Sequence, residues 1–436
     1  MEKKKRGLSL LAALMALCTM LTSPVWGAES TEEGAAEDAA YYAAYFAMTE
    51  ANLTAGSDQA ETNLGDLVAD AMRWKAEKAG EKADAALIAA ASLDSAAAIP
   101  AGDVARGTIR DLLPGEDTLC VIRVTGEQLL EALEAATRES PAASETFPQV
   151  SGLTFTVNGL VSYLEGESYS DTAYFAPAQP GRRITVSTVG EREFRSAATY
   201  TIATTGSIAA GGTAYGAFAG AVVAYDEGET LESVVMEYIA EALSGVISAE
   251  QYGSAQERIR VIGYQDVSAD SWYAPGINFV TTRSLMQGSG GYFYPDREMS
   301  RAMVASALYR MAGSPAVVGH SPFLDVAEDA WYADAVMWAA ERGLINGTGD
   351  GYFQPDGSIT REQLAAILFR YAEMAIPTGS LDRYTDSDSV SAYAREAMRW
   401  AVGAGLIGGA TETTLNPQGT ATRAQTATIL MRYAMS

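Results

Sequence analysis

Three arginines open what the sequence predicts to be three amphipathic helices. Arg301, Arg361 and Arg423 each follow a serine or threonine and are spaced 60 and 62 residues apart. In the last two copies a glutamine lies three residues after that threonine, which is the sequence signature of a capping box. A guanidinium at a helix N-terminus is suited to an anionic ligand, because the free N–H groups and the cation both attract negative charge. The alternative is that these arginines only pair with nearby carboxylates, such as Glu362 or Asp356.

The segments that precede these arginines repeat as well. Residues 266–273 and 325–332 share an Asp-Val step and a Trp-Tyr step, and residues 386–393 are a weaker copy with Ala392 in place of the tryptophan. A turn that contains glycine and then a proline follow in every copy. The chain therefore holds a threefold repeat of about 60 residues, each copy predicting two helices and a loop. One such helix pair cannot bury its apolar face alone, whereas three can close around a shared core.

Residues 264–436 resemble three S-layer homology repeats on these motifs. The resemblance implies an all-α, pseudo-threefold unit whose grooves bind anionic, often pyruvylated, secondary cell-wall polysaccharide. The residues it assigns to polysaccharide binding are Arg301, Arg361, Arg423, Trp272 and Trp331, the tryptophans being core, groove wall or direct contact. The aspartates expected to brace the loops are Asp266, Asp325 and Asp386. The third repeat departs from the pattern at Ser387 and Ala392, which makes Arg423 the weakest of the expected contacts.

Composition excludes several kinds of site. The chain has 30 Lys and Arg against 55 Asp and Glu, a net charge of −25, which repels phosphate backbones and anionic lipid headgroups. The single histidine, His320, cannot build a histidine-rich zinc centre or a dinuclear phosphatase site, and it allows no Ser-His-Asp triad elsewhere. We expect neither a metal nor a cofactor, and no nucleic-acid partner.

The first 27 residues have the pattern of a secretory signal peptide. Four basic residues at 3–6 precede an apolar run at 7–21, and small residues allow cleavage after Gly27. The apolar run is about 15 residues, shorter than the roughly 20 that span a bilayer. Cleavage would leave only Cys120, so no intramolecular disulfide is expected. We therefore expect a secreted protein at the cell wall or S-layer surface, with no transmembrane segment in the mature chain.

The region between the leader and the repeats mixes helical and strand patterns. Leu64, Val68 and Met72 keep helical spacing, and a second helix is predicted after an N-cap at Thr125. Strand-like runs lie at 120–124, 153–157, 184–189 and 200–203. This irregular interleaving favours an α+β domain of about 200 residues. The predicted order is a signal peptide at 1–27, a lead-in of uncertain order at 28–55, the α+β domain at 56–262, and repeats at 264–314, 323–374 and 384–436.

Several segments of this region resemble, in order, the C-terminal domain of 5′-nucleotidases. They are residues 61–72, 99–103, 112–114, 125–129, 147–153, 199–204 and 209–212. In whole enzymes of that family an N-terminal metallophosphoesterase domain holds two metals, and the C-terminal domain grips the nucleoside. Residues 28–60 are too few for the metal domain, so metal-assisted hydrolysis by the usual mechanism is not expected.

The residues that would grip a nucleoside are also largely replaced. The family's Asn-Gly-Gly-Gly-Ile-Arg loop corresponds to residues 89–98, which contain no Asn, Gly or Arg. Gly115 and Ser207 stand where the family has two base-stacking phenylalanines, a loss of about 1–3 kcal/mol of stacking each. What remains of the nucleotide loop is Gly211, Gly212 and Tyr215, and a tight turn is the simpler explanation of the two glycines.

The sequence thus predicts a wall-anchored surface protein that displays a nucleotidase-like domain and is not catalytic alone. One alternative is an accessory substrate-binding subunit for extracellular nucleotide hydrolysis, completed by a separate metallophosphatase. Another is a purely structural S-layer component. The ligand or protein partner of the first domain and the oligomeric state are not predicted.

Overall fold

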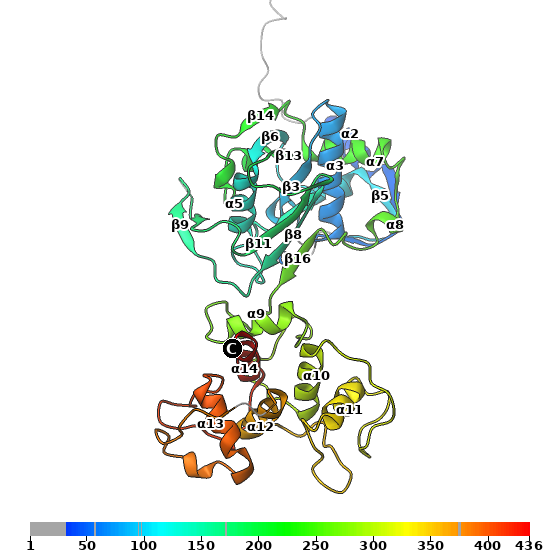
Figure 1. Cartoon of the computed structure of the whole chain (residues 1–436). Helices are drawn as coiled ribbons and strands as arrows, with labels where there is room; N and C mark the ends of the chain where they lie inside the picture. Colours follow the sequence, from blue (N-terminus) through cyan, green and yellow to red (C-terminus); the bar gives the residue numbers. More distant parts are fainter. Residues whose placement is uncertain (1–31, 56–57, 95, 97, 171, 374–375) are drawn as a thin grey trace, which may run out of the picture.

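A computed structural model describes residues 32–436 except 56–57, 95, 97, 171 and 374–375. The predicted signal peptide at 1–27 lies outside the described residues. An α+β body is followed by a helical body, and the chain passes between them once, through β16 (Ile259–Ile262) (Figure 1). None of the described helices is long and apolar enough to span a bilayer.

A five-stranded sheet forms the centre of the α+β body. Its order is β14 (Val222–Tyr225), β6 (Leu119–Thr125), β13 (Thr199–Thr205), β3 (Ala85–Ala89) and β7 (Pro148–Ser151). Side chains of α3 (Asn63–Lys78) share one core with Ala86 and Ile88, while those of α5 (Gly126–Ala136) share another core with Ala85 and Leu87. Because neighbouring residues of a strand point to opposite faces, the two helices cover opposite faces of this sheet. The N-cap predicted at Thr125 is confirmed and forms a full capping box, and Thr62 caps α3.

A second sheet carries the chain out of this body. It runs β12 (Arg192–Glu193), β11 (Ile184–Val189), β8 (Leu153–Asn158) and β16, the last two being parallel. Buried and half-buried residues alternate along β8, as expected for a strand with one face on the core. Further elements of the body from residue 90 onward are η1 (Ala90–Ser92), α4 (Arg106–Leu112), β9 (Glu165–Ser168), β10 (Phe175–Pro177), α6 (Gly206–Ala209), η2 (Gly216–Phe218), α7 (Leu231–Glu241) and α8 (Ala249–Tyr252).

The segment expected to be a lead-in of uncertain order belongs in part to this body. After α2 (Glu32–Ala43), β1 (Tyr45–Thr49) lies between β5 (Gly102–Ala105) and β15 (Val246–Ile247), and β2 (Leu53–Thr54) pairs with β4 (Ala98–Ile99). Ala47 and Leu53 are fully buried. The α+β body therefore begins before residue 56. Strands of five and two residues are too short to give a detectable period, which is why the sequence did not predict them.

The helical body contains two α-helices for each repeat. They are α9 (Ala274–Thr282) and α10 (Arg301–Met311), α11 (Ala333–Glu341) and α12 (Arg361–Tyr371), and α13 (Arg395–Gly403) and α14 (Arg423–Met435), with 3₁₀ turns η3 (Ser387–Ser389) and η4 (Ala392–Ala394) before α13. The second helix of every repeat starts at the predicted arginine behind a Ser or Thr cap, and Thr360 and Thr422 form capping boxes. Among the described residues from 264 onward, β-pairing is limited to isolated bridges.

A closed ring of backbone hydrogen bonds links the three repeats. The N–H of Met299 donates to Ala421 O, that of Ala421 to Ile359 O, and that of Ile359 to Met299 O, each over 2.9 Å. The helices follow the same cyclic order, because α10 packs on α11, α12 on α13, and α14 on α9. One apolar core runs through all three repeats. Each repeat is thus completed by its neighbours, as expected for units that cannot bury their apolar faces alone.

The packing of α9 on α14 leaves no room for a side chain at Gly276. A Cβ at this position would lie 2.7 Å from the backbone N and Cα of Thr428. We expect Gly276→Ala to lower the free energy of unfolding of the helical body by about 1–3 kcal/mol, because the two helices must separate. Urea unfolding measures this change. Gly408→Ala is the matched control, since a Cβ there meets open space, and an equal loss in both variants would contradict the packing argument.

Candidate functional site

Each of the three predicted arginines reaches into the next repeat. Arg361 donates from Nε to Leu415 O (2.9 Å) and from Nη2 to Gly408 O (2.7 Å). The corresponding acceptors, at 2.6–2.8 Å, are Phe353 O and Asn346 O for Arg301, and Phe293 O and Gln287 O for Arg423. Among the described residues no ion pair joins these arginines to a carboxylate, so the alternative pairing with Glu362 or Asp356 is wrong. The arginines therefore hold neighbouring repeats together.

The helix N-termini behind these arginines are already occupied. In α12 the N–H of Arg361 donates to Gly419 O and that of Glu362 to Pro417 O, while the N–H of Gln363 donates to the Thr360 hydroxyl. The equivalent acceptors are Gly357 O and Pro355 O for the first two N–H groups of α10, and Arg297 O and Pro295 O for those of α14. The predicted anion site at a free helix N-terminus is therefore corrected. An outside ligand would find the guanidinium edge, not the helix end.

Burial leaves only part of each guanidinium accessible. Arg361 and Arg423 are 6% and 8% exposed, whereas Arg301 is half-buried. Desolvation lowers the pKa of all three side chains, but arginine stays protonated at any ordinary pH. With Nε and Nη2 bound to carbonyls, Nη1 is the remaining donor, and for Arg361 its one contact is a long one, 3.5 Å to Gln425 Oε1. Each guanidinium thus keeps its positive charge and a spare N–H donor.

Two of these arginines lie in grooves with a tryptophan from another repeat. We name the first the Trp272 groove, a hollow of about 370 Å³ lined by Trp272, Arg361, residues 406–410 and the α14 residues Gln425, Thr428, Ile429 and Arg432. The second, the Trp331 groove, is about 210 Å³ and is lined by Trp331, Arg423, Leu285, Met286, Gln287, Met299, Met303, Ser306 and Arg310. Both tryptophans are exposed, at 64% and 63%, and each packs edge-on against the following tyrosine. They are groove walls and not core residues.

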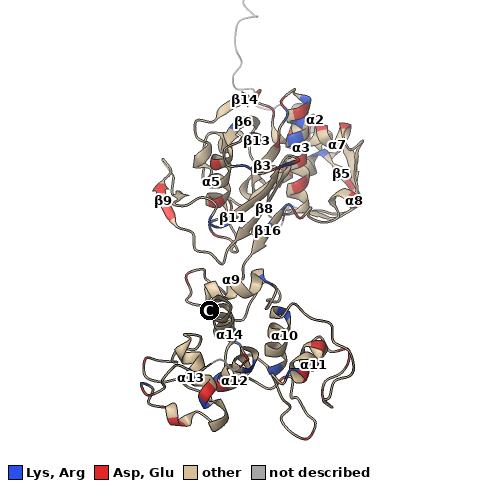
Figure 2. Cartoon of the chain, viewed as in Figure 1, with Lys and Arg blue, Asp and Glu red and all other residues tan. Residues whose placement is uncertain are grey.

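A second arginine completes each of these sites, and the sequence analysis missed it. Arg310, Arg370 and Arg432 lie nine residues after the first arginine of their helices. They donate from Nη1 to Leu285 O (3.1 Å), Leu344 O (2.9 Å) and Leu406 O (3.3 Å), respectively. Figure 2 marks the basic residues of α10 and α12 among the mostly uncharged helices of this body. The fixed nine-residue offset in all three repeats was the signal that could have revealed them.

The third possible groove lacks its tryptophan. In the other two grooves an arginine lies beside the tryptophan of the preceding repeat in the cyclic order. For Arg301, whose side chain contacts Asn346 O, the residue at that tryptophan position is Ala392 of the third repeat. The tryptophans of the other two repeats serve Arg361 and Arg423. The replacement of the tryptophan by Ala392 therefore falls beside Arg301, whereas the sequence associates it with Arg423 of the same repeat. The sequence could not show this, because it places each arginine with its own repeat.

The predicted aspartates each accept two backbone hydrogen bonds from the loop before the second helix. Asp325 accepts from the N–H of Phe353 (2.8 Å) and of Gln354 (2.7 Å). Asp266 binds Phe293 and Tyr294, and Asp386 binds Leu415 and Asn416, over the same distances. Tyr294, Gln354 and Asn416 all have φ between +50° and +58°. Each aspartate thus holds a residue in the left-handed region, which costs free energy for a residue other than glycine.

These hydrogen bonds make the stability of the repeats sensitive to acid. Desolvation alone would raise the pKa of Asp325, but the N–H groups of Phe353 and Gln354 outweigh it and hold the pKa below its ordinary value of 3.8. Because the folded-state pKa is depressed, the stabilisation is complete above pH 3.8 and is lost as the pH falls through the folded value. We expect Asp325→Asn to lower the unfolding temperature at pH 6, with a difference from wild type that shrinks toward pH 3. Asp296→Asn, at an exposed position, is the control, and a difference independent of pH would contradict the argument.

The remnants of the nucleotide loop face the core or form turns. Tyr215 is fully buried and its hydroxyl donates to Thr146 O (2.7 Å), so its ring is not available to a ligand. Gly211 has φ of +84° at the end of α6, as in a tight turn. Ser207, which stands where the family has a stacking phenylalanine, hydrogen-bonds to the Asp117 carboxylate.

A hollow lies beside Gly115, which stands where the family has the other stacking phenylalanine. It is about 380 Å³ and is lined by Ala91, Ser92, Leu113, Gly115, Glu116, Asp117 and Leu231. These described lining residues include no aromatic ring and no arginine, and their two charges are negative. Such a surface repels a phosphate and offers no face for a base to stack on. Within the described part of the chain, no three His, Cys, Asp or Glu side chains are grouped to hold a metal ion.

Family models match both the α+β body and the helical body. The family model described as 5′-nucleotidase, C-terminal domain, matches residues 43–220, and that of the S-layer homology domain matches 263–303, 322–365 and 383–427. An amylopullulanase of Thermoanaerobacterium thermosulfurigenes is 30% identical over 37% of this chain and 9% of its own length. The surface-layer 125 kDa protein of Lysinibacillus sphaericus is 29% identical over 46% of this chain and 16% of its own. A 5′-nucleotidase precursor of Thermus thermophilus has a similar structure, with 25% identity, a TM-score of 0.43, and coverage of 53% of this chain and 42% of that one.

These matches fix what the chain contains and where it is located. It carries a 5′-nucleotidase C-terminal domain followed by three S-layer homology repeats, and it is a secreted protein of the cell wall or S-layer surface. The chain spans less than a fifth of the length of these curated relatives.

Proposed function

We propose that this chain, a 5′-nucleotidase C-terminal domain joined to three S-layer homology repeats, is anchored by an acidic wall polysaccharide bound in the Trp272 and Trp331 grooves. The observation that carries the proposal is the pairing, in each groove, of an exposed indole with two arginines from other elements. An indole face suits the apolar side of a sugar ring, and a guanidinium suits its carboxylate or pyruvyl group. Two such sites on one pseudo-threefold body would bind one polymer with avidity.

Local charge makes this binding compatible with an acidic protein. The whole chain carries −25, but the charged residues that line the two grooves are Arg361, Arg432, Arg423 and Arg310. Charges beyond about 8–10 Å are screened at physiological salt, so the groove arginines dominate what a bound sugar experiences. The proposal thus requires no overall attraction between the protein and the wall.

The direct test is co-sedimentation of the full chain with purified walls. We expect the protein to sediment with intact walls and to stay in solution with walls whose polysaccharide has been removed by hydrofluoric acid. Soluble polysaccharide released from the same walls should compete with binding. Equal sedimentation with intact and stripped walls would contradict polysaccharide anchoring and favour binding to peptidoglycan or to other protein.

We further propose that the α+β domain neither hydrolyses nor binds nucleotides by itself. Support comes from the acidic hollow beside Gly115, the burial of Tyr215 and the lack of a metal-binding group among the described residues. A ligand at one hundred times its dissociation constant would stabilise the domain by about 2.7 kcal/mol. We expect no change in the unfolding temperature of the full chain with nucleosides, nucleotides or nucleotide-sugars, measured by thermal shift. A clear shift would contradict this proposal and favour an accessory subunit for nucleotide hydrolysis.

A further inference from the structure

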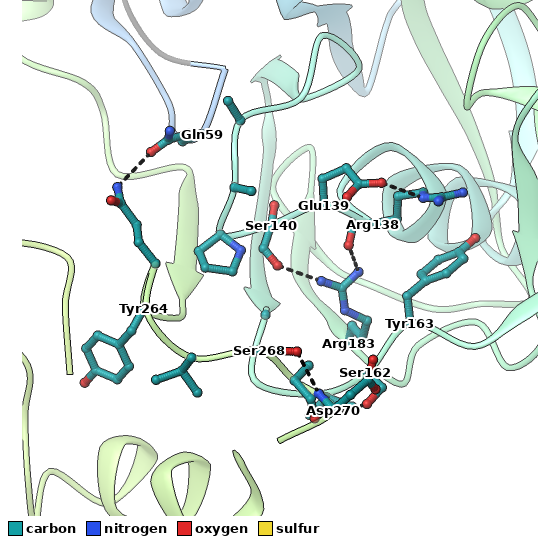
Figure 3. A pocket seen from close by; sticks show the side chains of 18 of the residues that line it. Gln59, Arg138, Glu139, Ser140, Ser162, Tyr163, Arg183, Tyr264, Ser268 and Asp270 are labelled. Atoms are coloured by element: carbon teal, nitrogen blue, oxygen red, sulfur yellow. Dashed lines mark hydrogen bonds and ion pairs between the residues drawn. The ribbon is translucent and has the colours of Figure 1, made fainter. Parts of the chain in front are cut away.

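A large hollow lined by described residues lies at the joint between the two bodies. It measures about 920 Å³, at the upper end of the volumes typical of small-molecule sites. One wall consists of residues 138–143 after α5, residues 159 and 161–165 after β8, and Arg183. The opposite wall is the start of the first repeat, residues 264–265 and 267–270. We name it the joint cavity; Figure 3 shows the side chains around it.

Direct contacts between the two bodies hold the joint cavity in shape. The Asn158 side chain donates to Asn278 Oδ1 (2.9 Å) and the Ser162 hydroxyl to Ala269 O (3.2 Å). Leu160 of the α+β body is buried in the core of the repeats, and the N–H of Gly159 holds the end of the linking strand β16 through Ile262 O (2.8 Å). The two walls are therefore fixed relative to each other before any ligand arrives, which lowers the entropic cost of binding.

Two buried polar atoms in the wall have no partner. Arg183 is 3% exposed and donates from Nη1 and Nη2 to the carbonyls of Thr137, Arg138 and Ser140. Its Nε, and the hydroxyl of Ser140, which is 4% exposed, have no hydrogen-bond partner among the described residues. Both residues line the joint cavity (Figure 3). Buried polar groups are normally satisfied, and these two atoms are shielded from solvent, so a small movement of the wall on binding would let a ligand hydroxyl group or a bound water satisfy them.

An aromatic ring in the same wall is held rigidly. Tyr163 donates its hydroxyl to Phe175 O (2.6 Å), and the guanidinium groups of Arg138 and Arg183 each lie 5.8 Å from its ring centroid. A fixed ring beside planar polar groups is suited to the apolar face and the hydroxyls of a sugar.

The charges of the lining argue against an anionic ligand. Arg138 is already paired with Glu139 (2.8 Å) and Glu165 (3.5 Å), and the Arg183 guanidinium is bound to three carbonyls. With Asp270, the lining holds three carboxylates and two arginines. The described lining therefore carries more negative than positive charge, which disfavours a carboxylate or phosphate as the ligand. We propose that the joint cavity binds an uncharged oligosaccharide, at a site separate from the grooves of the repeats.

Calorimetric titration of the full chain tests this proposal. The probes are chitotetraose, cellotetraose and mannotetraose, with tetragalacturonate as the charged comparison. We expect at least one neutral probe to bind, Tyr163→Ala to weaken it at least 10-fold, and Tyr163→Phe to retain most of the affinity because the ring remains. The Trp272→Ala, Trp331→Ala double variant should bind the same probe as wild type does.

Each contrary outcome overturns a defined part of the proposal. No heat with any neutral probe, or tighter binding of tetragalacturonate than of every neutral probe, rejects the neutral-sugar site. Loss of binding in the tryptophan variant but not in Tyr163→Ala places the sugar in the grooves and not at the joint. Wall anchoring is measured separately by sedimentation, so its failure would leave this result unaffected.

Discussion

Replacing Trp272 and Trp331 together by alanine is expected to weaken binding to purified wall polysaccharide by about 1,000-fold. Each indole forms an exposed wall of its groove, and aromatic residues of this kind contribute about 2 kcal/mol or more where they carry an interface. Because both side chains are more than 60% exposed, their loss leaves the core intact. The unfolding temperature should therefore remain close to that of the wild type. Titration with soluble wall polysaccharide and a thermal scan measure the two quantities on one preparation.

The matched control removes two other exposed rings from the same repeats. Tyr292 and Tyr352 are 40% and 46% exposed and line neither groove. Their double replacement by alanine should leave the affinity within about twofold of wild type, since scattered surface aromatics are energetically neutral contacts. Wild-type affinity in the tryptophan variant, or equal losses in both double variants, would show that the grooves do not carry the binding. A separate variant, Ala392→Trp, tests whether a tryptophan beside Arg301 increases the affinity of the protein for the polysaccharide.

The helices and strands of this chain were predictable where local signals agree. The caps at Thr125, Thr360 and Thr422 fix helix starts, and the apolar alternation around residues 153–157 and 184–189 matches β8 and β11. These signals lie within a few residues of one another, so one sequence is enough to detect them. The short strands β1 and β2 have no such signal, and only their burial in the finished domain defines them.

The residues that make up each groove were not predictable, because the three repeats pack in a ring and each groove is lined by residues of different repeats. The sequence associates Arg301 with Trp272, yet the Trp272 groove contains Arg361 and the α14 residue Arg432. Only the backbone ring through Met299 and Ala421 reveals that each groove draws on three repeats. The joint cavity was missed for the same reason. One wall comes from residues between 138 and 183 and the other from residues 264–270, and no spacing rule connects them.

Replacing Arg361 by alanine is expected to destabilise the helical body as well as to weaken binding. The side chain is 6% exposed, and its two carbonyl bonds to Leu415 and Gly408 join the second repeat to the third. Hydrogen bonds from a charged donor contribute about 1.5–3 kcal/mol each, so a loss of about 3 kcal/mol in unfolding free energy is expected. Arg361→Lys should recover little of it, since an ammonium cannot reproduce the planar fork. Urea unfolding measures the change.

Arg432 is the control that distinguishes the two roles of Arg361, which are joining neighbouring repeats and contacting the polysaccharide. It lines the same groove and is exposed, and its contacts with the carbonyls of Gly405 and Leu406 are long, at 3.5 and 3.3 Å. Arg432→Ala should therefore lower affinity for wall polysaccharide by about 10-fold with a stability change below about 0.5 kcal/mol. If Arg361→Ala instead unfolds like wild type while losing all binding, the arginine is a ligand contact alone. In that case the repeats are held together by their shared core and backbone ring, and the bonds to Leu415 and Gly408 contribute little.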